Sequence, residues 1–337
     1  MKDLKSRLSF LPKWNYRDKG IVYALIIFWL IIFIANENFR KVDNYLSILR
    51  EGSFVGVAAI GMTLCIISGA FDLSIGSMLG MLSLITLDLV GKFGLLPTIL
   101  IILALGGICG MVNGLLYAKL RIPAFIATLG MYYVYKALAL IYSNGNPIQF
   151  KEHWFTVIGN GSFLGLPIPF IIFVILAILG TIILRRTPLG RHILAIGNSE
   201  KVSYISGINI QRTKIIIFML VGVFTAAAAI LISSRLWSAN AGMKDGFEFD
   251  VILVVILGGT NLAGGKGSIF NTFIASIFFA SLYTAMNIFQ VESFMQLAVK
   301  GFVLLFAFSF TGIRHNIEVR MRKRKKHTQT VAKSEPT

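Results

Sequence analysis

Charge-free apolar stretches recur along almost the whole chain, and short polar segments separate them. A helix needs about 20 mostly apolar residues to cross the hydrocarbon core of a bilayer, so each long stretch predicts a transmembrane helix. The predicted helices are ten in number, at residues 21–35, 53–71, 74–91, 95–117, 122–141, 168–184, 214–235, 250–263, 268–289 and 293–313. The pattern therefore predicts an all-α polytopic membrane protein.

The composition excludes several other classes of protein. Hydrophobic residues make up 56% of the 337 positions and charged residues only 14%. A soluble globular chain carries about 25% charged residues. A soluble enzyme, a disordered chain and a disulfide-stapled secreted domain are therefore all excluded.

The basic residues predict the orientation in the membrane. The chain has 32 Lys and Arg against 15 Asp and Glu, a net charge of +17. With the N-terminus in the cytoplasm, the inner segments hold 23 basic residues and the outer segments seven. Basic residues prefer cytoplasmic loops, so we predict that both termini are cytoplasmic.

This orientation divides the chain into three parts. We predict a cytoplasmic N-terminal segment at 1–20, a transmembrane domain at 21–313 and a basic cytoplasmic tail at 314–337. Six of the seven residues from 320 to 326 are basic. Such a cluster is attracted to anionic lipid head groups. No aromatic residue interleaves these charges, which disfavours a nucleic-acid partner.

Two connecting segments are too long to be simple turns. The outer one, 142–167, begins with Asn-Gly-Asn-Pro at 144–147, a turn sequence. The inner one, 185–213, is amphipathic and partly helical in pattern. It lies either on lipid head groups or in the groove of a partner protein.

Catalytic and metal-binding patterns are missing from the sequence. The histidines are far apart and none has a partner at metal-ligand spacing; they are His153, His192, His315 and His327. The run 264–268 resembles a phosphate-binding loop but has Thr260 and Gly267 where that motif needs Gly and Ser or Thr. We therefore expect no enzymatic activity, no metal and no ATP bound by this chain.

Two polar, glycine-rich breaks interrupt the apolar pattern, at 68–77 and 258–268. They are loosely alike, which hints at an internal duplication. Breaks at membrane depth mark cavities or substrate paths. Asp72 in the first break has two compatible interpretations: it caps the helix that starts near Ser74, or it lies in a transport path.

Other polar side chains occur within the predicted helices. Thr63, Asn113, Thr128 and Asn287 can hydrogen-bond either a neutral polyol or a neighbouring helix. Lys136 and Lys300 can extend towards the outer membrane surface or line an outward-facing cavity. Both pairs of alternatives stay open at this stage.

Several short sequences follow one another between residues 50 and 313 in an order and at a spacing typical of one family. They are Gly-Met-Thr at 61–63, Ser-Gly-Ala-Phe-Asp-Leu-Ser-Ile-Gly-Ser at 68–77, Ala-Thr-Leu-Gly-Met at 127–131, Thr-Pro-Leu-Gly-Arg at 187–191, Ala-Ile-Gly-Asn at 195–198, Ser-Gly-Ile-Asn at 206–209, Leu-Gly-Gly-Thr at 257–260 and Gly-Gly-Lys-Gly at 264–267. With these blocks the chain resembles the membrane permease subunits of ATP-binding-cassette importers for ribose and related sugars.

The resemblance implies import of a sugar (a pentose, a hexose or a furanosyl signal molecule) across the bacterial cytoplasmic (inner) membrane, with ATP bound by a partner subunit. It implies that 185–213 is the coupling loop that docks on this ATPase, through Leu189, Gly190, Arg191, Gly197, Glu200, Ser206, Gly207 and Ile208. The residues expected along the translocation path are Thr63, Ser68, Asp72, Ser74, Asn113, Thr128, Thr260, Asn261 and Lys266.

The implied partners are the ATPase subunit, a solute-binding protein that meets the outer segment 142–167, and a second permease subunit, either identical or paralogous. The alternative function is a secondary transporter driven by an ion gradient. Such proteins usually carry paired ionisable residues at the bilayer midplane. Here no acidic residue lies in the middle of a predicted helix apart from Asp72 near an inner edge and Asp88 near an outer one, which counts against the alternative.

Overall fold

The computed structural model describes residues 20–150 and 152–306, in two units that divide after Val291. The predicted segments 1–20 and 314–337 therefore lie almost entirely outside the described residues. In the described part, seven helices are long and apolar enough to cross a membrane. They are α3 (Val42–Ile67), α4 (Ile75–Phe93), α5 (Leu95–Ala118), α6 (Ala124–Ser143), α8 (Ile168–Arg186), α11 (Ile210–Leu236) and α13 (Ile269–Ile288).

Shorter elements connect these helices. Two further apolar helices, α2 (Gly20–Ala35) in the first unit and Ser293–Phe306 in the second, have fewer residues than a span. The remaining short helices are η3 (Glu37–Arg40), α7 (His153–Asn160), α9 (Pro188–Asn198), α10 (Glu200–Ile205) and α12 (Phe247–Leu257). The prediction of an all-α polytopic protein is confirmed, and the number of ten spans stays a prediction.

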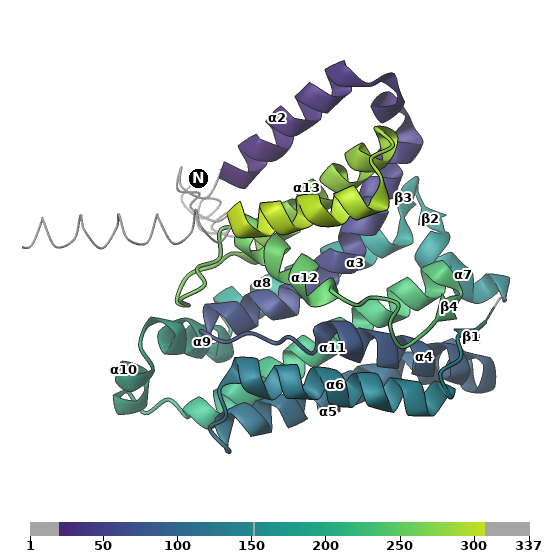
Figure 1. Ribbon diagram of the computed structural model, residues 1–337. Coiled ribbons are helices and arrows are strands. Elements are labelled where there is room, and N and C mark those ends of the chain that lie inside the picture. Colours follow the sequence, from purple (N-terminus) through teal and green to yellow (C-terminus); the bar gives the residue numbers. More distant parts are fainter. Residues whose placement is uncertain (1–19, 151, 307–337) are drawn as a thin grey trace, which may run out of the picture. The chain divides into compact units, whose positions relative to one another are not determined.

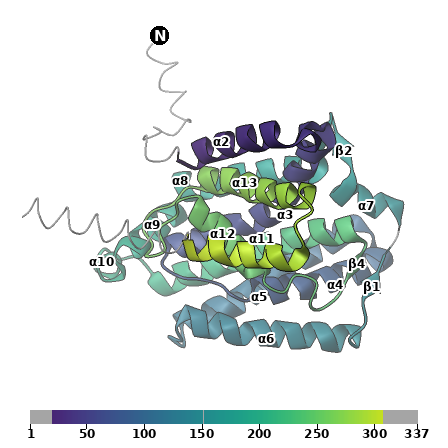
Figure 2. The same ribbon diagram turned by 45° about the horizontal axis from the view of Figure 1, so that its top comes forward.

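In the first unit, α3 and α11 form the centre. Figures 1 and 2 show α2 beside α13 at one edge of the unit, α5 beside α6 at the other, and α3 and α11 between them. The apolar window of α3 is 89% buried, whereas that of α6 or α8 is only 22% buried. The apolar side chains that α6 and α8 expose suit contact with lipid or with another subunit.

Small residues allow the closest helix contact, between α5 and α11. A side chain at Gly106 or Gly110 would overlap the backbone of α11 at Gly222 or Phe218. Such small-residue interfaces let two helix backbones approach each other in a membrane. The contact joins α5 firmly to the central helix.

The two long connecting segments fold locally. In the outer segment, the predicted turn is confirmed, since Asn144 and Gly145 both have positive φ. Three two-residue strands follow in this segment: β2 (Ser162–Phe163) pairs with β3 (Leu166–Pro167), whereas β1 (Ile148–Gln149) pairs with the distant β4 (Ser238–Ala239), which comes after α11. In the inner segment, α9 and α10 confirm the predicted partial helix.

Two predicted boundaries are wrong. Instead of a helix over 250–263, α12 spans only Phe247–Leu257, about 16 Å at 1.5 Å per residue. It ends because Gly259 adopts φ +77°, a left-handed conformation that only glycine adopts without strain. Instead of starting at 53, α3 starts at Val42. Its first turns contain polar and charged residues, so the apolar pattern did not include them although they are helical.

Candidate translocation and coupling site

The first helix break lies between α3 and α4. The Gly69 N–H donates to the Ile66 carbonyl (2.9 Å) and the Ala70 N–H to the Cys65 carbonyl (3.2 Å). With Gly69 at φ +86°, this is a Schellman motif, which satisfies the last carbonyls of α3. The chain then crosses to α4 through residues 70–74.

Asp72 is fully buried in this break. Its Oδ1 accepts hydrogen bonds from the Ser74 N–H (2.9 Å) and the Ser74 hydroxyl (2.6 Å). Its Oδ2 accepts one from the Asn113 side-chain amide (3.0 Å). The expected interaction with the start of α4 is therefore present, although Ser74 itself holds the N-cap position.

Two helices complete the surroundings of Asp72. From α5, the Asn113 amide also donates to the Ser74 hydroxyl (2.8 Å). From α6, the Thr128 hydroxyl oxygen accepts from the Leu73 N–H (3.0 Å), and the Tyr135 hydroxyl donates to Asn113 Oδ1 (3.0 Å). All these groups are buried, so they form one polar network that joins the break to α5 and α6.

The second helix break follows α12 and begins with the same geometry. The Gly259 N–H donates to the Ile256 carbonyl (2.8 Å) and the Thr260 N–H to the Val255 carbonyl (3.3 Å), again a Schellman motif. The two breaks thus match in local geometry as well as in sequence, which agrees with an internal duplication.

The side chains of the second break are less well satisfied. Thr260 is buried, and its hydroxyl has no hydrogen-bond partner among the described residues. Asn261 bonds within its own loop, to the Gly264 carbonyl (3.0 Å) and the Ala263 N–H (3.2 Å). Lys266 is exposed.

The two breaks meet each other. The Gly265 N–H donates to the Ile67 carbonyl at the end of α3 (2.8 Å). Four residues before the end of α3, the Thr63 hydroxyl lies 2.9 Å from the Thr272 hydroxyl on α13, and the two share a hydrogen bond. Ser68 donates to the Cys65 carbonyl within the first break (2.7 Å). The structure therefore brings Thr63 and Ser68 close to the second break.

The predicted coupling loop contacts this meeting point. The helix α9 begins at Pro188, where Thr187 caps it by accepting from the Gly190 N–H (3.2 Å). At its other end, a Cβ on Gly197 would overlap the Ile67 carbonyl oxygen and the Gly265 nitrogen. The Asn198 amide also donates to the Gly265 carbonyl (3.4 Å). Gly197 is thus the point where α9 contacts both breaks.

The next helix, α10, presents an apolar surface to solvent. Its side chains Val202, Tyr204 and Ile205 are 61%, 74% and 75% exposed. Glu200 at its start pairs with the Lys214 ammonium group on α11 (2.9 Å). This ion pair holds α10 against α11 and leaves the apolar side chains free.

The other predicted coupling residues surround these helices. Leu189 is half-buried and Gly190 buried, whereas Arg191, Ser206 and Gly207 are exposed. A cavity of about 880 Å³ opens between α10, the start of α11 and the α5–α6 turn. Its lining includes Tyr117, Arg121, Tyr204, Ile208 and Lys214.

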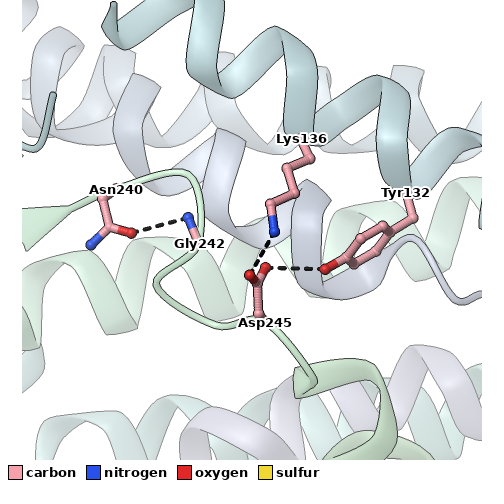
Figure 3. Close-up of polar contacts among 5 residues, drawn as sticks. All are labelled: Tyr132, Lys136, Asn240, Gly242 and Asp245. Carbon is pink, nitrogen blue, oxygen red and sulfur yellow. Dashed lines mark hydrogen bonds and ion pairs between the residues drawn. The ribbon is translucent and has the colours of Figure 1, made fainter. Parts of the chain in front are cut away.

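Lys136 has a partner that the sequence did not reveal. Its ammonium group donates to Asp245 Oδ2 (2.6 Å), and the Tyr132 hydroxyl donates to Asp245 Oδ1 (3.1 Å). Figure 3 shows both side chains reaching from α6 to Asp245, in the loop between β4 and α12. Asp245 is 109 residues away from Lys136, so no local sequence pattern points to the pair.

Among the described residues, no group of three or more metal-binding side chains occurs.

Comparison with known proteins decides the family. The family of branched-chain amino acid transport system / permease components matches residues 44–308. The chain belongs to this family. It is a membrane-embedded component of a transport system and not an enzyme, as the sequence predicts.

Curated relatives cover most of this permease component. The ribose import permease protein of Bacillus subtilis is 39% identical over 86% of this chain and 90% of its own length. The L-arabinose transport system permease protein of Escherichia coli is 34% identical over 91% of this chain and 93% of its own length. The xylose transport system permease protein of Haemophilus influenzae is 30% identical over 88% of this chain and 96% of its own length. No solved structure matches the chain.

Proposed function

We propose that this chain is the permease subunit of an ATP-binding-cassette importer that carries a pentose into the bacterial cytoplasm. The three relatives above are named for ribose, L-arabinose and xylose, all pentoses. These names support a sugar as cargo, and the matching family over residues 44–308 supports the role of a transport permease. ATP is bound by a separate ATPase subunit.

The contact of Gly197 with both helix breaks carries the proposed mechanism. The exposed side chains of α10 offer an apolar surface for a groove of the ATPase subunit. When ATP binding moves that subunit, α9 transmits the movement through Gly197 to Ile67 and Gly265. The two breaks then change their relative position, which switches the path between outward and inward access.

The predicted path residues have two roles in this proposal. Asp72, Ser74 and Asn113 are buried and bonded to one another, and the buried Thr128 accepts from the Leu73 N–H, so these four residues hold the first break in shape and form the wall of the path. Around the second break, Thr63, Ser68, Thr260, Asn261 and Lys266 border the part of the path that changes with the coupling loop.

Partners cover the remaining surfaces. A second permease subunit packs against the poorly buried faces of α6 or α8. The outer segment that contains α7 and the β2–β3 hairpin meets a solute-binding protein. Both termini lie in the cytoplasm, and the short helices α2, α12 and Ser293–Phe306 complete the ten predicted spans.

Reconstitution tests this function. The chain is purified from its native membranes with its associated proteins, placed in liposomes with its solute-binding protein, and supplied with labelled ribose, xylose and L-arabinose. ATP on the ATPase side should drive uptake of at least one pentose, and uptake should stop when the ATPase is inactivated. Uptake driven by a proton or sodium gradient without ATP would instead support a secondary transporter.

A further inference from the structure

Charged side chains of α6 and the neighbouring loop form a cluster at membrane depth. Lys136 lies seven residues before the end of α6 at Ser143, or about 10 Å along the helix. Its side chain is 31% exposed and that of Asp245 is 45% exposed. An exposed charge pair is costly in hydrocarbon, so this side of α6 faces water or cargo rather than lipid.

A second carboxylate next to this pair has one oxygen without a hydrogen-bond partner. Glu248, in the first turn of α12, is 6% exposed, and its Oε2 has no hydrogen-bond partner within residues 20–150 and 152–306. It lies against Gly76, where a Cβ would overlap Oε2. The charges of Asp245 and Lys136 act on it electrostatically. A buried acceptor without a donor is costly, and a hydroxyl group would supply the missing donor.

The loop that carries Asp245 has a defined conformation. Asn240 Oδ1 accepts a hydrogen bond from the Gly242 N–H (3.0 Å), which closes a turn before Asp245 (Figure 3). On the other side, a Cβ on Gly80 of α4 would lie 3.1 Å from the Ala241 carbonyl oxygen, so the loop packs closely against α4. The loop thus holds Asp245 in front of α6.

We infer that Tyr132, Lys136, Asp245 and Glu248 form a contact site for the hydroxyl groups of the sugar on the outer part of its path. The carboxylates and the phenol oxygen accept hydrogen bonds from sugar hydroxyls, and the ammonium group donates to sugar oxygens. A neutral polyol offers donors and acceptors together, so it matches a cluster that contains both. The inference rests on the proposed sugar cargo and names the residues that would recognise it.

The test compares variants of this site in the reconstituted importer, always with the same solute-binding protein. Asp245→Asn and Tyr132→Phe each remove one interaction at nearly constant volume. A double variant, Lys136→Asp with Asp245→Lys, exchanges the two charges. Lys92→Met is the matched control, because Lys92 pairs with Asp88 at 2.8 Å near the end of α4, away from the site. Uptake of ribose is measured beside that of 2-deoxyribose and 5-deoxyribose, and co-purification of the ATPase subunit checks assembly.

We expect Asp245→Asn to lower ribose uptake about tenfold and to shift the ratio between ribose and a deoxyribose towards one, because a lost contact matters only for a sugar that made it. The charge exchange should not restore either value, and Lys92→Met should change neither. Restoration by the charge exchange would overturn the inference, because it would show that the ion pair only supports the fold. So would an equal loss for all three sugars. If wild type imports no pentose with ATP, the proposed function fails and this inference fails with it, whereas unchanged ratios beside a working wild type refute the inference alone.

Discussion

The two helix breaks begin alike and are stabilised differently. Both follow a Schellman motif with glycine at positive φ, at Gly69 and Gly259. The first break contains a buried carboxylate, Asp72, whose two oxygens are both hydrogen-bonded, and helices α5 and α6 supply partners. The second bonds mostly to itself, leaves the Thr260 hydroxyl unpaired, and contacts α9 and the end of α3.

This difference indicates a division of work between the breaks. A satisfied buried network is rigid, so the first break is a fixed wall joined to α4, α5 and α6. The second break has fewer bonds to the rest of the unit and contacts the coupling segment directly. It is the part that α9 can displace, and the predictions below test this contrast from the largest expected effect to the smallest.

The largest effect is expected for Gly197→Val. The new side chain would overlap the Ile67 carbonyl and the Gly265 nitrogen, and overpacking of this kind costs about 1–3 kcal/mol. Since 1.4 kcal/mol is a factor of ten, we expect ATP-driven uptake to fall at least about fivefold. Co-purification of the ATPase subunit should persist, because α10 is unchanged. Gly130→Ala is the control, since no atom lies within 4 Å of its new Cβ. Equal uptake by the two variants would contradict the proposed contact.

The next effect concerns the apolar surface of α10. Truncation of Tyr204 and Ile205 to Ala should weaken binding of the ATPase subunit about tenfold or more, because large exposed side chains act as anchors in interfaces. Affinity in detergent measures the change, and thermal unfolding should stay the same. Leu164→Ala serves as control, since this side chain is 88% exposed in the outer hairpin. Loss of ATPase binding in the control would place the docking surface elsewhere.

A smaller effect is expected in the first break. Asn113→Leu removes the amide that donates to Asp72 and Ser74, and leaves a buried carboxylate oxygen without a donor. Such a loss costs about 1–3 kcal/mol. The melting temperature of the purified chain should fall, and Tyr135→Phe, which loses one hydroxyl, should lower it less. No change for Asn113→Leu would mean that the first break is not held by this network.

The smallest effect distinguishes the breaks by its sign. Thr260→Val replaces an unpaired buried hydroxyl by a methyl group, so stability should stay equal or rise by about 1 kcal/mol. The matched change Thr128→Val in the first network removes an acceptor of the Leu73 N–H and should lower stability. Thermal unfolding of both variants provides the comparison, and a loss of equal size in each would remove the contrast between the breaks.

Much of the fold follows from the sequence pattern, because an apolar run of membrane length must satisfy its backbone hydrogen bonds within itself and therefore forms a helix. The end of α12 was mispredicted for a specific reason: Leu262 and Ala263 continue the apolar pattern beyond glycines that end the helix. The sequence also located Asp72, Asn113 and Thr128 as polar groups within the membrane-spanning region. The structure shows that all three bond to neighbouring parts of the protein.

Other features required three-dimensional information. Tyr135 looks like an ordinary apolar-face residue in the sequence, yet it completes the Asp72 network through Asn113. The partner of Lys136 comes from a distant loop. Gly197 was expected in the coupling loop, but its contact with both breaks depends on how α3, α9 and the 258–268 loop converge. Such contacts are set by tertiary packing and leave no local signal.

Hydrogen exchange of the importer, measured with and without ATP bound to its ATPase subunit, tests the central claim most directly. If α9 moves the second break and the first is fixed, ATP should change the exchange of amides in 188–198 and 259–266 and leave those in 69–74 unchanged. An equal change in both breaks, or a change confined to 69–74, would contradict the account.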